Sequence, residues 1–224
     1  MEILTRYRPA LLDAVEALMA DQGEAPLLDM ARYHMGLAEV DGTPSRTAVG
    51  KMIRPTLCLA VCEALGGVVD DCLPAAVSLE IVHRTSLVFD DIQDNSRQRN
   101  HRDTVWEVCG VNQALNVGLA LSAIGRLALQ GMTGRVDTAL ILLVERRLEE
   151  AVVDLCRGQY QDLDFLETLP TVAGYMEMIR LKTGVLVGAS CQVGALVAGA
   201  MHQAAAARCF GEALGVAFQL HDDY

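Results

Sequence analysis

A long apolar run that ends in paired aspartates is the most informative part of this chain: residues 79–94 are LEIVHRTSLVFDDIQD. In a helix, Asp90 and Asp94 lie one turn apart on the same face, and His83 lies on that face about two turns earlier. Two carboxylates stacked in this way, with no Lys or Arg between them, repel each other. Mg²⁺ would relieve this repulsion, since it binds oxygen ligands and commonly uses one or two carboxylates together with substrate phosphates. The alternative is a solvated acidic helix end, because short motifs also match by chance.

A second acidic pair closes the sequence, which ends FQLHDDY at residues 218–224. Gln219 lies one helical turn before Asp223, so the two side chains share a face. If this end faced the first acidic stretch, Asp222 and Asp223 would help to form a cage for several Mg²⁺ ions and a diphosphate. The alternative is that both acidic pairs are ordinary polar helix ends.

Composition favours an all-α protein. The chain has 224 residues, of which 52% are hydrophobic and only 4% aromatic, so Ala, Val and Leu must fill its interior. Proline, the main helix breaker, occurs six times. The length suits one domain, and no linker or repeat interrupts it, so we predict a single all-α domain over residues 1–224.

Charge and cysteine usage exclude several classes of partner and site. The net charge of −11 makes nucleic acid an improbable partner, because phosphate backbones need a basic surface. The seven cysteines include no CxxC pair, and the first eight residues hold no apolar signal core, which together indicate a reduced, cytoplasmic protein. Cys58 and Cys62 would share a helix face, but they lack the ligand spacing of a zinc site. The most membrane-like run, residues 185–201, is rich in Gly and Ala, so we predict a closely packed helix and no membrane span.

Apolar periodicity predicts helices along the whole chain and strands nowhere. Residues 95–103 are strongly polar and predict a loop, and a break is expected near Gly184 within one helical stretch. The expected helices are 9–20, 27–36, 51–65, 73–94, 112–130, 137–164, 175–200 and 204–224.

Three motifs in order give the chain a family resemblance: GKMIRP at residues 50–55, the aspartate motif, and Lys182-Thr183-Gly184. With them the chain resembles the trans-isoprenyl diphosphate synthases from about Leu27 to Tyr224. The resemblance implies a helical bundle of the isoprenoid synthase type with a central active-site cavity, and a homodimer. It also implies a Mg²⁺-dependent reaction in which an allylic prenyl diphosphate ionises and its carbocation is attacked by isopentenyl diphosphate.

The resemblance assigns roles to individual residues. Asp90 and Asp94 would be the principal Mg²⁺ ligands, Asp91 would support them, and Asp222 and Asp223 would begin a second aspartate motif. Two further sets would bind the substrates: Arg99, Lys182, Thr183 and Gln219 the allylic diphosphate, and Lys51, Arg54 and His83 isopentenyl diphosphate. The residues expected to carry catalysis are Asp90, Asp94, Lys182 and Asp222.

Some of these residues also have plainer interpretations. Lys51 and Arg54 are three residues apart, so on a helix they would project together toward one phosphate, although a basic patch at a helix N-terminus would look the same. A lone helical histidine such as His83 is usually structural. A further polar group is interpreted as supporting or structural: Gln159, Asp162 and Asp164.

The sequence departs from the family pattern after the first aspartate motif. Where the family has Arg-Arg-Gly-x-Pro-Thr, residues 99–104 are RNHRDT, so Asn100 replaces an arginine that would hold isopentenyl diphosphate. Losing such a charge-assisted contact costs about 1.5–3 kcal/mol. Arg97 or Arg102 could replace it. Met52 and Leu119 also replace charged residues of the pattern, and the pattern would continue beyond Tyr224, which predicts a C-terminally truncated sequence.

Three functions remain open at this point. The favoured one is elongation to a geranylgeranyl or longer trans-polyprenyl diphosphate, because Thr85 and Ser86, just upstream of the aspartates, are too small to block a growing chain. A terpene cyclase-like relative that ionises one prenyl diphosphate is the second. A non-catalytic subunit of a heteromeric synthase is the third.

Overall fold

The computed structural model describes residues 2–46 and 48–224, and these residues are mostly helical with almost no sheet, which confirms the all-α prediction. The chain divides into two compact units. The first unit holds the residues up to Ile53 together with Val77–Gly131, and the second holds Arg54–Ala76 and Met132–Tyr224. The assignment of all 224 residues to one domain stays a prediction.

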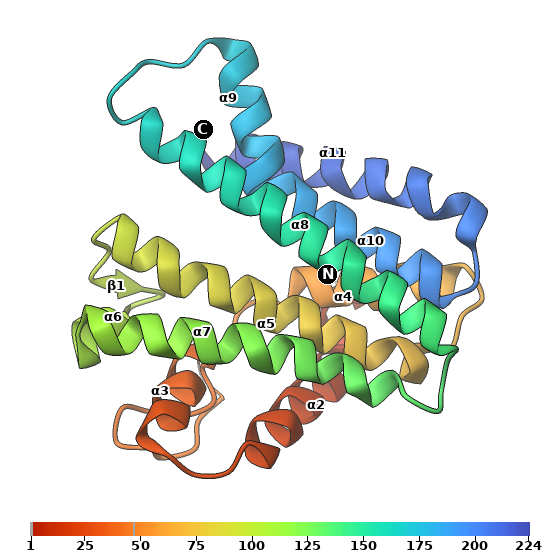
Figure 1. Cartoon of the computed structure of the whole chain (residues 1–224), viewed down its shortest axis with the longest axis horizontal. Helices are drawn as coiled ribbons and strands as arrows, with labels where there is room; N and C mark the ends of the chain where they lie inside the picture. The colour runs from red at the N-terminus through yellow and green to blue at the C-terminus, as the bar shows by residue number, and fades with distance from the viewer. Residues whose placement is uncertain (1, 47) are drawn as a thin grey trace. The chain divides into compact units, whose positions relative to one another are not determined.

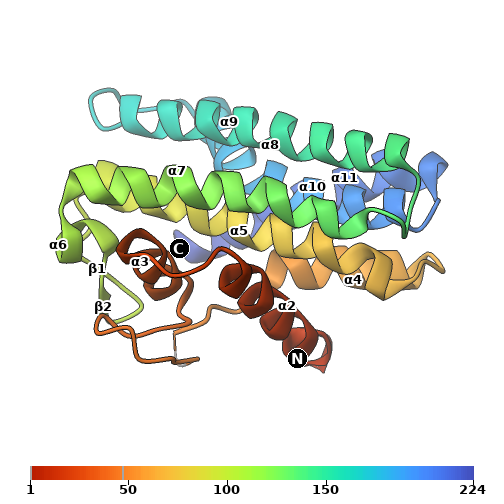
Figure 2. The same ribbon diagram turned by 60° about the horizontal axis from the view of Figure 1, so that its bottom comes forward.

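The first unit is built on two long helices. The second part of α5 (Val69–Gln93) runs beside α7 (Val111–Ala128), as Figures 1 and 2 show. A Cβ on Gly118 would lie 2.7 Å from the Phe89 ring, so glycine at this position leaves room for the ring between α7 and α5. The shorter elements of this unit are α1 (Glu2–Arg6), α2 (Arg8–Asp21), α3 (Pro26–Met35), α6 (Val105–Cys109) and η1 (Leu129–Met132).

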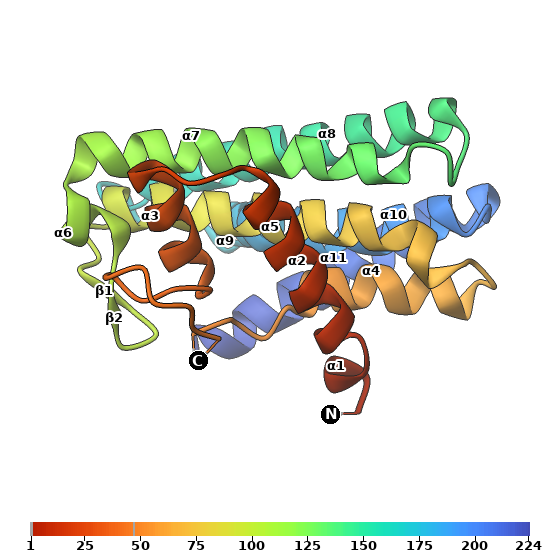
Figure 3. The ribbon, with the colours of Figure 1, turned by 90° about the horizontal axis from the view of Figure 1, so that it is seen from below.

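A small hairpin lies where a polar loop was expected. Strands β1 (Gln98–Arg99) and β2 (Arg102–Asp103) pair antiparallel, and Figure 3 shows them near α3. Asn100 and His101 join them with φ values of 52° and 64°, the two left-handed residues that a type I′ hairpin turn requires. The prediction of no strands was therefore wrong here, because two-residue strands are too short to show alternation.

The second unit consists of the remaining helices. These are α4 (Ile53–Ala64), the first part of α5, α8 (Thr138–Asp164), α9 (Val172–Ile179), the π-helix η2 (Arg180–Gly184), α10 (Val185–Val197), η3 (Met201–Gln203) and α11 (Ala204–Asp222). The break expected near Gly184 is confirmed as the π-helical turn η2, which joins α9 to α10. π-Helical turns are rare overall, and many of those that are found lie at functional sites.

Small residues let α10 pack closely against its neighbours. A Cβ on Gly194 would lie 2.3 Å from the Cys58 carbonyl oxygen of α4, and one on Gly211 of α11 would lie 2.5 Å from the Val187 carbonyl oxygen. Most of α10 is buried, as predicted for residues 185–201. Among the described residues, α5 alone is long and apolar enough to cross a membrane, and 61% of its most apolar stretch is buried within the structure, as in a core helix.

Candidate functional site

The first aspartate motif lies at the C-terminal end of α5. Asp90 is half-buried, Asp94 is exposed just beyond the last helical residue, and the Asp94 N–H donates to the Asp90 carbonyl at 2.8 Å. The helical geometry therefore extends to Asp94, and the expected one-turn spacing of the two carboxylates is present. His83 is half-buried on the same helix.

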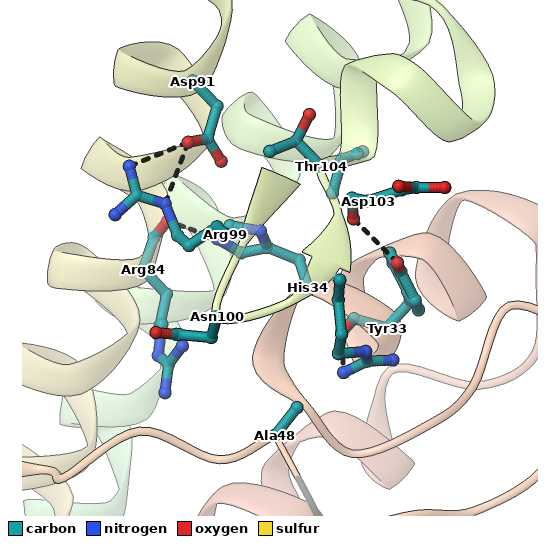
Figure 4. Close-up of a pocket in the computed structure, with 11 residues that line it drawn as sticks. Tyr33, His34, Ala48, Arg84, Asp91, Arg99, Asn100, Asp103 and Thr104 are labelled. Carbon is teal, nitrogen blue, oxygen red and sulfur yellow. Dashed lines mark hydrogen bonds and ion pairs between the residues drawn. The ribbon is translucent and has the colours of Figure 1, made fainter. Parts of the chain in front are cut away.

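Asp91 lies in different surroundings, since it is only 2% exposed. The Nε and Nη2 atoms of Arg99 each lie 2.8 Å from its Oδ1 atom (Figure 4). Burial raises the pKa of the Asp91 carboxyl, and the Arg99 guanidinium opposes this shift. The pair fixes the hairpin strand β1 to α5, so Asp91 orients an arginine that sequence reasoning assigned to substrate.

A pocket of the first unit lies between α3, α5 and the hairpin, with a cavity of about 30 Å³ (Figure 4). Three arginines are among its lining residues: Arg84, Arg99 and Arg102. Arg102 already has several partners: its Nη2 donates to the Ala38 carbonyl at 2.7 Å, and its guanidinium lies 4.2 Å from the centre of the Tyr33 ring. The suggestion that Arg102 replaces the arginine missing at position 100 is therefore not supported.

Arg84 is the most deeply buried of the three arginines, at 5% exposure. Its Nε donates to the Glu80 carboxylate at 2.9 Å, one helical turn away. Its backbone carbonyl lies 2.7 Å from His34 Nε2. Burial and the positive charge of Arg84 lower the pKa of His34 to about 3, so His34 is neutral and donates this hydrogen bond.

Lys51, one of the three residues expected to bind isopentenyl diphosphate, does not lie in the helix predicted for it. The helix α4 begins at Ile53, and Met52 has a left-handed φ of 52°, so Lys51 lies outside the helix. The argument that Lys51 and Arg54 share a helix face is therefore wrong. Lys51 is exposed and Arg54 lies half-buried in the first turn of α4.

The second unit gathers four of the predicted site residues and one partner residue in a pocket around η2. The Thr183 hydroxyl donates to Gln219 Oε1 at 2.8 Å, and Gln219 Nε2 donates to Asp223 Oδ1 at 2.8 Å. Lys182 Nζ donates to Asp162 Oδ2 at 2.5 Å. These residues share the pocket with Met178 and Ile179.

Asp223 also has a partner that sequence reasoning missed. The Tyr175 hydroxyl of α9 donates to its Oδ2 at 2.5 Å, and this hydrogen bond raises the pKa of Tyr175. The two residues are 48 positions apart, and an isolated tyrosine gives no signal of such a contact. Asp222, the other expected ligand of this motif, is exposed at the last residue of α11.

A close contact between backbones positions Lys182. A Cβ on Gly158 of α8 would lie 2.3 Å from the Lys182 backbone nitrogen. Only a glycine at position 158 lets α8 approach η2 so closely, and this approach brings Asp162, one turn further along α8, to the Lys182 ammonium group. Asp162, interpreted from the sequence as supporting, is thus the direct partner of Lys182.

The carboxylates present fit Mg²⁺ in number and kind. Among residues 2–46 and 48–224, no group of three or more His, Cys, Asp or Glu side chains is close enough to hold a metal ion by itself. Asp90 and Asp94 offer two hard oxygen groups, the number that Mg²⁺ commonly takes from protein when substrate phosphates supply further ligands.

Comparison with known proteins gives consistent matches. A family model described as polyprenyl synthetase matches residues 43–224. The chain is 39% identical over 218 residues to a geranylgeranyl diphosphate synthase of Mycobacterium tuberculosis, covering 96% of this chain and 60% of that protein. It is also 39% identical over 209 residues to a (2E,6E)-farnesyl diphosphate synthase of the same species, covering 92% and 56%.

A solved structure agrees with these relatives. The crystal structure of a polyprenyl synthetase from Streptomyces coelicolor superimposes with a TM-score of 0.90 at 35% identity, covering 99% of this chain and 64% of that one. The chain therefore spans roughly three fifths of the length of the proteins that it matches.

Proposed function

Because the chain belongs to the polyprenyl synthetase family, we propose that it is a trans-prenyltransferase of isoprenoid biosynthesis. It would join an allylic prenyl diphosphate to isopentenyl diphosphate and release a longer trans-polyprenyl diphosphate. The observation that carries this proposal is the one-turn pair Asp90 and Asp94 on α5, in a chain that also holds the hydrogen-bonded group of Lys182, Thr183, Gln219 and Asp223.

We propose Mg²⁺ as the cofactor, held by Asp90 and Asp94, with Asp222 and Asp223 contributing through the second motif. When bound, Mg²⁺ neutralises the diphosphate leaving group and stabilises the charge that develops as the allylic carbon–oxygen bond breaks. Asp91 was first expected to support the metal ligands. We assign it instead to orienting Arg99, because its Oδ1 is occupied by the Arg99 guanidinium.

The cationic side chains would bind the substrate phosphates. Arg99 uses Nε and Nη2 for Asp91, and its side chain is 36% exposed, so its remaining N–H groups can reach a diphosphate. Lys182 is 27% exposed beside Asp162, which holds the ammonium group in place. Thr183 and Gln219 would orient the same diphosphate through their shared hydrogen bond.

The product would be geranylgeranyl diphosphate or longer. The hydroxyl groups of Thr85 and Ser86 donate to carbonyls of their own helix at 2.9 and 2.8 Å, so both positions present small surfaces. The matched relatives include a geranylgeranyl and a farnesyl diphosphate synthase, so the family alone leaves chain length open.

We also propose a homodimer in the cytoplasm. Leu115 and Leu119 on α7 are 43% and 66% exposed, and such apolar side chains suit a contact with a second copy. Within residues 2–46 and 48–224 no cysteine forms a disulfide, which suits a reducing compartment. Light scattering tests the dimer, and a monomeric mass would contradict it.

The decisive experiment for the reaction is a direct product assay. The protein is incubated with Mg²⁺, farnesyl diphosphate and labelled isopentenyl diphosphate, and the products are separated by chain length. Elongated labelled product supports the proposal. A second candidate, ionisation of a single prenyl diphosphate in a cyclase-like reaction, is favoured by the missing guanidinium at Asn100, and it predicts hydrocarbon or alcohol products without incorporated label. Release of neither product would favour the non-catalytic subunit.

A further inference from the structure

Arg84 uses fewer of its N–H groups within the described residues than the other two arginines of the first unit's pocket. Arg99 is ion-paired with Asp91, and Arg102 binds the Ala38 carbonyl and the Tyr33 ring. Arg84 donates from Nε to Glu80, and within the described residues its Nη1 and Nη2 atoms make no hydrogen bond. A guanidinium carries five N–H donors, so four of them are directed elsewhere than to Glu80.

The side chain that carries these donors is held in place. Arg84 is 5% and Glu80 2% exposed. The Nη2 atom lies 2.7 Å from the position that a Cβ on Gly50 would occupy, so Gly50, the residue before Lys51, makes room for the guanidinium. An oxygen-rich group that entered the pocket would therefore gain several hydrogen bonds without ordering the arginine.

Asn100 lines the same pocket as Arg84 (Figure 4). Its φ of 52° is left-handed, a conformation that asparagine adopts more readily than arginine. In the family pattern a glycine follows the second arginine, whereas His101 is found here, also with a left-handed φ of 64°. The backbone conformation of the turn therefore explains why position 100 is an asparagine. It does not explain which residue supplies the positive charge that the family pattern has at this position.

We propose that Arg84 binds a phosphoryl group of isopentenyl diphosphate and supplies the guanidinium that position 100 lacks. This inference rests on the proposed function and names a specificity-determining residue that the family motifs do not contain. The cavity of about 30 Å³ has room for one or two groups the size of a water molecule, such as the oxygens of a phosphoryl group. His34 is neutral, and the carboxylate of Asp91 is neutralised by Arg99, so neither opposes an anion strongly.

The test is calorimetric titration of the purified protein with isopentenyl diphosphate in EDTA. Without metal the aspartate motifs cannot hold a diphosphate, so the titration reports sites built from cationic side chains. R84Q alone would leave the buried Glu80 carboxylate unpaired, so the main variant is E80Q/R84Q, with circular dichroism to check its fold. We expect binding at least about 10-fold weaker than in the unchanged protein.

Two further variants keep the inference falsifiable. R84K retains a charge beside Glu80 and so should fold, but it lacks the planar fork of donors, and it should also weaken binding about 10-fold. Adding N100R/H101G to E80Q/R84Q restores an arginine followed by a flexible glycine in the turn, and affinity should recover most of the loss. R146Q is the matched control, since Arg146 is an exposed helical arginine paired with Glu150, and its affinity should be unchanged.

The outcomes separate this inference from the reaction itself. Unchanged affinity in folded E80Q/R84Q and in R84K would overturn it and leave Arg84 as a structural partner of Glu80. If E80Q/R84Q loses affinity equally for isopentenyl diphosphate and inorganic pyrophosphate, a phosphoryl-binding site is supported. If it loses affinity for pyrophosphate alone, the assignment to isopentenyl diphosphate is overturned. Binding that depends on Arg84 in a protein that makes no elongated product would support the site while contradicting the proposed function.

Discussion

Replacing Gly158 with alanine should destabilise the protein, although alanine is the better helix former. The added Cβ would lie 2.3 Å from the Lys182 backbone nitrogen and 2.7 Å from the Leu181 backbone carbon. Ordinary contacts between such atoms are roughly 3.5 Å or longer, so the helix backbones must move apart by about 1 Å. No flexible side chain can absorb this movement.

The magnitude follows from two opposing terms. Alanine in a helix interior gains about 0.5–1 kcal/mol over glycine. Overpacking costs about 1–3 kcal/mol, and the upper end applies because both atoms in the clash are backbone. The net loss in the free energy of unfolding is therefore about 2 kcal/mol, which lowers the urea midpoint by about 1 M at a typical slope for a small protein.

The assay is urea unfolding followed by circular dichroism, with G125A as the matched control. Gly125 is also inside a helix, but a Cβ there would meet the Ile81 side chain at 3.4 Å, an ordinary contact. G125A should therefore keep or slightly raise stability. If G158A were as stable as G125A, the close approach of α8 to η2 would be refuted, and with it the account of how Asp162 reaches Lys182.

Three further predictions concern chemistry and pH. D90A and D94A should each abolish product formation while the protein stays folded, because removing one of two like charges relieves repulsion; near-normal rates at limiting Mg²⁺ would contradict the metal role. T85F/S86F should shorten the main product if these positions border the growing chain, and chromatography showing an unchanged length would contradict that placement. The pKa of His34 is about 3 in the fold and about 6.5 in an unfolded chain. Below pH 6.5 the unfolded state therefore binds the extra proton, and the free energy of unfolding should fall by up to about 1.4 kcal/mol per pH unit. In H34Q this part of the slope should vanish, and equal slopes in both proteins would show that His34 is not its source.

The long helices were predictable because apolar periodicity continues through them. Residues 137–164 were expected to be helical, and α8 spans Thr138–Asp164. The break near Gly184 was also predicted, although its π-helical type was not, because no local residue preference specifies a wider turn. The predicted start of the helix at residue 51 was wrong. Met52 has a left-handed φ of 52°, which the sequence pattern does not reveal, so the helix begins at Ile53 and Lys51 is not helical.

The candidate site was predictable where a motif names the residue and unpredictable where a distant partner decides its role. The sequence indicated Asp91 and Arg99 separately, but the pair they form depends on the hairpin that folds β1 back toward α5. Arg84 lies within a run read as apolar, and its significance depends on Gly50, which is 34 residues earlier in the chain. Tyr175 became relevant only through its contact with Asp223.

The π-helical turn has a consequence for comparing and engineering sequences of this kind. A turn of this width holds one more residue than an α-helical turn, so the chain gains a residue there without gaining a turn. The apolar pattern of α9 therefore does not continue in phase into α10, and a single helical wheel drawn through residues 172–197 assigns inward and outward positions wrongly on one side of η2. Deleting one residue from Arg180–Gly184 should give a continuous α-helix in which α10 keeps its rotational phase relative to α9, because the wider turn already offsets the extra residue. The buried small residues of α10 would then still face α4 and α11, and the change would fall on the turn itself, which holds Lys182 and Thr183.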